Sequence, residues 1–204
     1  LNFLAFATMI ALFHAQGETV ATATTIMFNW DLVSFIPLLG IEVAVTSLVG
    51  RYMGADQPQV AYRAALSAIK TGIFYSVVIL ALFVLIPEWL VRVFHPDIPS
   101  QIFEDAVPIA VRMIQIAALY VLAEAVMVAI VGALRGAGDT HFTMMASVTM
   151  HWLFVPMLYL TLNVLGMPVT VSWFILVVFF LIFCNVLIWR FRSGKWKKIK
   201  VIQS

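Results

Sequence analysis

Charged residues are scarce in this sequence. They make up 11% of its 204 residues, whereas hydrophobic residues make up 63%. A soluble domain carries about a quarter charged residues, so this chain has too few charges to cover a surface exposed to water. That composition excludes a cytosolic enzyme, a nucleic-acid-binding module and a disordered segment. The formal net charge of +2 gives no reason to expect a nucleic-acid partner. We therefore expect an integral membrane protein, in contact with the lipid bilayer.

The sequence also lacks the motifs of common enzymes. It contains no GxxxxGK[ST] phosphate loop and no HExxH, GxSxG or CxxC motif. The single cysteine, Cys184, cannot form an internal disulfide, and the four histidines show no paired metal-ligand spacing. We expect no catalytic residues, no cofactor and no metal centre. The absences favour transport over catalysis.

Long apolar segments are what the sequence does contain. A helix needs about 20 mostly apolar residues to cross the hydrocarbon core of a bilayer. Five segments meet that length, and a sixth, 1–13, is apolar but short, as expected for the outer part of a helix whose beginning is missing. We expect an all-α polytopic membrane helix bundle, with six transmembrane helices between residues 1 and 189. The expected helices are 1–13, 23–49, 65–86, 107–134, 142–162 and 168–189.

The basic residues predict the orientation of these helices. If each helix crosses the membrane in turn, nine Lys and Arg residues of the connectors and tail fall on one side, and only Arg92 falls on the other. An excess of Lys and Arg marks the cytoplasmic side. We therefore expect both ends of the chain, including the basic tail 190–204, in the cytoplasm and the connector 87–106 outside. Within the tail, residues 195–198 predict an interfacial anchor on anionic lipid rather than a partner-binding site.

Three acidic residues, Asp31, Glu42 and Glu124, fall inside the expected helices. Acids within a membrane are costly and usually mark ion or substrate paths. Glu124 precedes Arg135 at the helix end by eleven residues, about 16 Å, which places it near the middle of a core about 30 Å thick. A carboxyl group there can exchange a proton or hold a monovalent cation. The alternative is a protonated glutamate that is hydrogen-bonded to a neighbouring helix.

Residues around these acids extend the candidate site. Tyr120 and Met127 lie one turn before and after Glu124, so they share its helix face. Asp31 and Glu42 are eleven residues apart, about three turns, and also share a face.

Two residues between Asp31 and Glu42 predict a hinge. Pro37 removes a backbone donor and Gly40 adds flexibility. A static packing kink is the alternative. Glu42 lies nearer the inner end of its helix, where it can reach interfacial water, and it ranks below Asp31 as a site.

Two segments resemble the multidrug and toxic compound extrusion (MATE) family. Residues 37–55 resemble its eighth helix, and residues 124–140, which include Arg-Gly-Ala-Gly-Asp-Thr, resemble the end of its tenth helix and the turn that follows. Residues 192–196 resemble its C-terminal end. The resemblance covers essentially the whole chain as the C-terminal lobe, helices seven to twelve. It implies two six-helix lobes around a central cavity, with both termini cytoplasmic.

The resemblance implies half of a secondary antiporter, which exports organic cations, drugs or other amphipathic compounds in exchange for sodium ions or protons by alternating access. Its partners would be a small-molecule substrate and the missing N-terminal lobe. The protein would lie in the plasma membrane of a bacterium. Glu124 matches the family's tenth-helix acid. The expected cation-binding residues are Glu124, Asp31 and Tyr120. The expected residues of the substrate cavity are Asn29, Glu42 and Met127. Apart from a coupling sodium ion, no metal is expected.

Two positions depart from the family pattern. The family often has a seventh-helix glutamate where this chain has Asn2, which leaves the choice of coupling ion open. Position 42 is usually small in the family, whereas this chain has Glu42.

Two other functions remain as alternatives. One is a flippase for lipid-linked sugars, which should have a cavity rich in Arg and Lys. The other is a membrane assembly subunit without transport activity, which counterion-dependent efflux would exclude.

Overall fold

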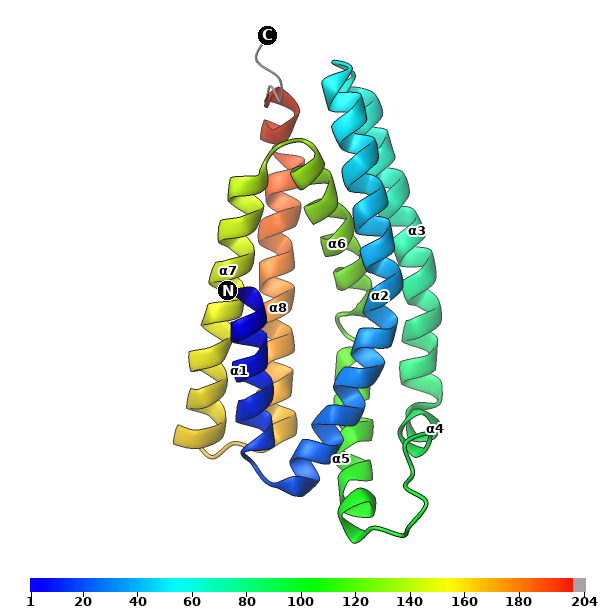
Figure 1. Cartoon of the computed structure of the whole chain (residues 1–204), viewed down its shortest axis with the longest axis vertical. Helices are drawn as coiled ribbons and strands as arrows, with labels where there is room; N and C mark the ends of the chain where they lie inside the picture. Colours follow the sequence, from blue (N-terminus) through cyan, green and yellow to red (C-terminus); the bar gives the residue numbers. More distant parts are fainter. Residues whose placement is uncertain (200–204) are drawn as a thin grey trace.

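The computed structural model of this protein describes residues 1–199, and in this part the chain forms helices joined by short connections (Figure 1). The long helices follow from the apolar runs, because a backbone in lipid has to satisfy its hydrogen bonds within its own segment. The helices are α1 (Asn2–His14), α2 (Glu18–Gly54), α3 (Pro58–Leu85), α4 (Pro87–Arg92), α5 (Gln101–Ala117), α6 (Val121–Gly136), α7 (Thr140–Tyr159), the π-helical turn η1 (Leu160–Val164), α8 (Val169–Arg192) and the 3₁₀ turn η2 (Lys195–Lys198).

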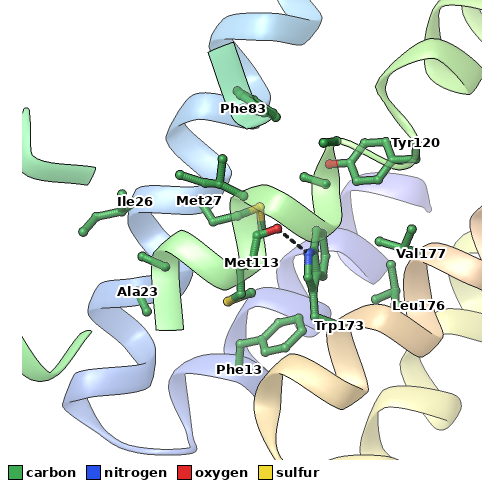
Figure 2. Packing of buried hydrophobic residues seen from close by; sticks show 14 of the residues in the cluster. Phe13, Ala23, Ile26, Met27, Phe83, Met113, Tyr120, Trp173, Leu176 and Val177 are labelled. Carbon is green, nitrogen blue, oxygen red and sulfur yellow. Dashed lines mark hydrogen bonds between the residues drawn. The ribbon is translucent and has the colours of Figure 1, made fainter. Parts of the chain in front are cut away.

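Four of these helices are long and apolar enough to cross a membrane singly: α2, α3, α7 with η1, and α8. The prediction of one continuous helix over 107–134 is wrong, because the structure has two helices there. These are α5 and α6, which meet at an angle of 52° across residues 118–120. Near the break, the indole N–H of Trp173 donates a hydrogen bond to the carbonyl of Met113 at 3.1 Å (Figure 2).

The helices form two groups (Figure 1). In one group α2 and α3 pack on each other and on α6, and α2 also packs on α5. In the other group α1 packs on α7, and α8 contacts both α7 and α6. The α2–α3 turn, the α6–α7 turn and the end of α8 lie at one end of the bundle, and the α1–α2 and α3–α5 connections lie at the other. The connectors alternate between ends as expected; which end faces the cytoplasm stays a prediction.

An aromatic core joins the two groups (Figure 2). The indole of Trp173, on α8, meets the rings of Phe13, Phe28 and Tyr120 edge-on, at centroid distances between 5.7 and 6.2 Å. These four rings come from α8, α1, α2 and the α5–α6 break. Edge-to-face contacts add to the apolar burial of such rings, so this cluster holds the two helix groups together.

The C-terminal segment folds back onto the bundle. Gly194 takes a left-handed backbone conformation, φ 65°, and turns the chain so that Trp196 is fully buried. Its ring stacks on Phe191 at 5.3 Å, and its indole N–H donates to the Phe191 carbonyl. Phe191 in turn stacks on Tyr62 of α3 at 5.5 Å. The Trp196 ring therefore packs inside the protein, and the expected anchor on anionic lipid stays a prediction for the lysines around it; residues 200–204 of the tail lie outside the described part.

Candidate functional site

A cavity of about 750 Å³ lies between the two helix groups. Residues of α1, α2, α6, α7 and α8 line it, together with Tyr120 at the α5–α6 break. Most of its wall is apolar, and rings such as Phe28, Phe154 and Phe180 contribute to it. The expected site residues that line this cavity are Asn29, Asp31, Glu42, Tyr120, Glu124 and Met127.

Tyr120 brings the acids of α2 and α6 into one place. Its hydroxyl donates a hydrogen bond to Oδ1 of Asp31. Its backbone carbonyl accepts from the N–H of Glu124 at 2.8 Å, in the first turn of α6. The ring is buried and packs on Phe180 at 5.3 Å, which fixes the direction of the hydroxyl. The break between α5 and α6 therefore positions the residue that links the two acids.

Glu124 carries a buried oxygen without a hydrogen-bond partner. The residue is only 6% exposed, and its Oε2 has no donor within residues 1–199. Burying a polar oxygen without a partner is costly. A carboxyl group in this position can lower that cost by taking up a proton or by binding a cation. No three His, Cys, Asp or Glu side chains of the described residues gather as a group that could hold a metal ion.

A second charged group lines the same cavity. Arg135, in the last turn of α6, donates from Nη1 to Oε1 of Glu42 on α2. Among the described lining residues, Arg135 is the only Lys or Arg, whereas three residues are acidic. The described lining of the cavity therefore holds more acidic than basic side chains.

Asn29 also faces the cavity, although its amide is engaged by its own helix. Its Nδ2 donates to the carbonyl of Thr25 at 2.8 Å. Pro37 and Gly40 do not line the cavity; both lie within α2, exposed on another face. Figure 1 shows the N-terminal part of α2 inclined to the rest of the helix. The hinge itself stays a prediction.

A polar stripe on α7 was not predicted from the sequence. Thr143, Ser147 and His151 line the cavity and are spaced four residues apart, so they share one helix face. His151 Nδ1 lies 2.8 Å from the Ser147 carbonyl, and Asn2 Nδ2 donates to Ser147 Oγ at 2.7 Å. The signal was present as three polar residues at helical spacing within the apolar segment 142–162.

The geometry can be compared with known proteins. The model of the MatE family matches residues 1–160. A probable multidrug resistance protein NorM from Thermotoga maritima is 29% identical, over 91% of this chain and 39% of that relative. The multidrug resistance protein PmpM of Pseudomonas aeruginosa is also 29% identical, over 72% of this chain and 30% of that relative. The chain thus spans well under half the length of these relatives.

Solved structures match almost the whole chain. An outward-facing multidrug resistance MATE family transporter of the MOP superfamily superposes with a TM-score of 0.80 at 18% identity, over 98% of this chain and 43% of that one. A MOP superfamily transporter from Pyrococcus furiosus, described as having a binding pocket of reversed polarity, superposes with a TM-score of 0.79 at 17% identity. The match covers 99% of this chain and 43% of that one. At these identities the match concerns the fold alone. It confirms the expected all-α membrane helix bundle.

Proposed function

The chain belongs to the MatE family, the multidrug and toxic compound extrusion family, and on that premise we propose that it forms the C-terminal half of a cation-coupled antiporter. The antiporter exports organic cations, drugs or other amphipathic compounds from a bacterium across its plasma membrane. Its partner is the N-terminal lobe, which would supply the second wall of the cavity. The observation that carries the proposal is the buried, unpartnered Oε2 of Glu124 in a cavity that also holds Asp31.

The cavity suits an amphipathic cation. Drug-sized ligands occupy pockets of about 300–1,000 Å³ that are mostly apolar with a few polar groups, and this cavity measures about 750 Å³. Aromatic faces attract organic cations, and its lining includes rings such as Phe28 and Phe154. Its acids add an electrostatic preference for positive charge.

The coupling step would use the acids of two helices. An ion or proton at Asp31 and Glu124 reduces the repulsion between their carboxylates, and so favours the arrangement in which α2 and α6 hold them together. Without the ion, the repulsion between the carboxylates favours the arrangement in which they are separated. The ion can shift this equilibrium because it binds the two arrangements with different affinity. Pro37 and Gly40, between Asp31 and the inner part of α2, would be the hinge of that change. Both sodium ions and protons fit this scheme.

Two alternatives predict other features. A flippase for lipid-linked sugars would need basic residues for pyrophosphate, whereas Arg135 is the only Lys or Arg in the described lining. An assembly subunit without transport needs no charged cavity. The acidic cavity favours export of cations over both.

The test is the substitution Glu124→Gln in the full-length transporter that contains this chain. Glutamine keeps the shape of the side chain and removes its charge. We expect normal insertion, and export of an organic cation under an imposed sodium or proton gradient at background level. Glu124→Asp should keep part of the activity, because the carboxylate remains but is one methylene shorter.

Glu88→Gln is the matched control. Glu88 lies exposed on α4, so the same chemical change there should leave gradient-driven export at the parental rate. Export by Glu124→Gln at the parental rate would show that Glu124 is a structural hydrogen-bonding residue and that ion coupling lies elsewhere.

A further inference from the structure

The Glu42–Arg135 pair is unequal in exposure. The Glu42 side chain is 14% exposed and that of Arg135 is 45% exposed. The pair spans the contact between α2 and α6 and lines the cavity that holds Asp31 and Glu124. A nearly buried carboxylate needs a countercharge, because removing the partner of a buried ion is strongly unfavourable. Arg135 provides that countercharge from a position that water reaches.

Glu42 is the fixed member of the pair. Its Cγ packs against Gly132 of α6, where an added Cβ would lie 3.1 Å away. The backbone around it is also held: the hydroxyl of Thr46 lies 2.7 Å from the Glu42 carbonyl and 3.1 Å from that of Gly132. Arg135 has a long side chain near the end of α6, and nearly half of it is exposed. The guanidinium can therefore swing away while the carboxylate stays in place.

We propose that Glu42 is an inner subsite for the cationic group of the substrate, and that Arg135 is its resident counter-ion, which the substrate displaces. This proposal rests on the proposed function, since it concerns how the same cavity takes up an organic cation. With no substrate bound, Arg135 neutralises Glu42. An entering organic cation takes over the carboxylate, and the guanidinium moves toward water. The subsite therefore selects compounds with a positive charge and lies apart from the proposed coupling site at Glu124.

The proposal predicts opposite effects for the two members of one ion pair. The probe is tetraphenylphosphonium, a permanently charged organic cation, titrated by calorimetry into the purified full-length transporter. Arg135→Gln removes the competing cation, so Kd should fall. Glu42→Gln removes the binding group, so Kd should rise. Hydrogen bonds to charged groups contribute about 1.5–3 kcal/mol, which corresponds to about ten-fold or more in each direction. The double variant should bind as weakly as Glu42→Gln.

Arg92→Gln is the matched control. Arg92 forms an exposed pair with Glu104 at 3.8 Å, in the connector away from the cavity, and its loss should leave Kd unchanged. A purely structural Glu42–Arg135 pair would make both single variants bind less tightly or equally well. An unchanged or raised Kd for Arg135→Gln would therefore overturn the proposal.

A further variant covers the case in which Arg135→Gln does not fold. Arg135→Lys keeps the charge but loses the planar fork of the guanidinium, so it should compete less well and lower Kd by a smaller factor. An unchanged Kd for that variant would then overturn the proposal. Failure of the proposed coupling role would show separately, because Glu124→Gln leaves both residues of this pair in place and is measured by gradient-driven export, whereas the variants of this pair are measured by the Kd for tetraphenylphosphonium.

Discussion

Tyr120 is the residue that connects the two candidate coupling acids. Its hydroxyl reaches Asp31 across the contact between helices, while its backbone begins the helix that carries Glu124. The ring is held by Trp173 and Phe180, so the hydroxyl has a fixed direction. A hydroxyl that donates to a carboxylate stabilises its ionised form. Tyr120 should therefore adjust the affinity of Asp31 for the coupling ion without binding the substrate itself.

Tyr120→Phe tests this role, because it removes the hydroxyl and keeps the packing of the ring. The loss of a hydrogen bond to a charged group costs about 1.5–3 kcal/mol. We expect the concentration of coupling ion that gives half-maximal export to change by about ten-fold or more, with the insertion of the protein unaffected. The matched control is Tyr159→Phe. Tyr159 is an exposed residue of α7, so its substitution should leave the ion dependence of export unchanged. An unchanged ion dependence for Tyr120→Phe would show that the hydrogen bond to Asp31 plays no part in coupling.

The sequence predicted the composition of this site better than its geometry. Asp31 and Glu124 could be found because charge inside an apolar segment is costly and rarely accidental. The sequence placed Tyr120 on the same continuous helix as Glu124, whereas it lies at a break and bonds to Asp31. The Glu42–Arg135 pair and the contact of Asn2 with Ser147 depend on how helices distant in the sequence pack. No local pattern encodes such contacts.

At the scale of helices, the α2–α6 crossing depends on small residues. A Cβ at Gly132 would lie 2.6 Å from Val45 Cγ1 and 2.7 Å from the Glu42 carbonyl, and one at Gly136 would lie 2.4 Å from the Thr46 carbonyl. Backbones in membranes approach closely where glycine leaves space, and a spacing of four residues puts both glycines on one face. This close approach is what brings Glu42 within reach of Arg135.

Gly132→Ala should therefore destabilise the lobe. Overpacking of a filled interface costs about 1–3 kcal/mol, and the better helix propensity of alanine offsets up to about 1 kcal/mol of that. Gly40→Ala is the matched control, since no atom lies within 4 Å of its added Cβ, and it should leave stability unchanged or slightly higher. Thermal unfolding of the detergent-solubilised full-length transporter measures the stability of both variants. Equal melting temperatures for the two variants would contradict the close crossing.

The apolar runs predicted most helices because length and hydropathy are local properties of the chain. The break at 118–120 was not predicted, since no proline or glycine marks it. It coincides with contacts from distant residues: Trp173 bonds to Met113 before the break, and Asp31 bonds to Tyr120 within it. The position of Trp196 likewise depends on a turn at Gly194 and a stack with Tyr62, contacts that a basic tail does not reveal.

At the scale of the whole molecule, two helix groups of the described residues line one cavity. The aromatic core around Trp173 connects these groups, and the close α2–α6 crossing holds Glu42 and Arg135 together in the cavity wall. Sites in transporters of this kind lie where two repeats meet. We therefore propose that the coupling ion and the exported cation share one cavity, where binding of each alters the affinity for the other.

The most direct test of this claim is ion movement driven by substrate alone. Proteoliposomes that contain the full-length transporter are loaded with ethidium, an organic cation, without an ion gradient, and uptake of sodium ions or protons is recorded as ethidium leaves. The account predicts ion uptake that depends on ethidium for the parent and for Glu88→Gln, and none for Glu124→Gln. Efflux of ethidium without ion uptake, or coupled uptake that persists in Glu124→Gln, would contradict it.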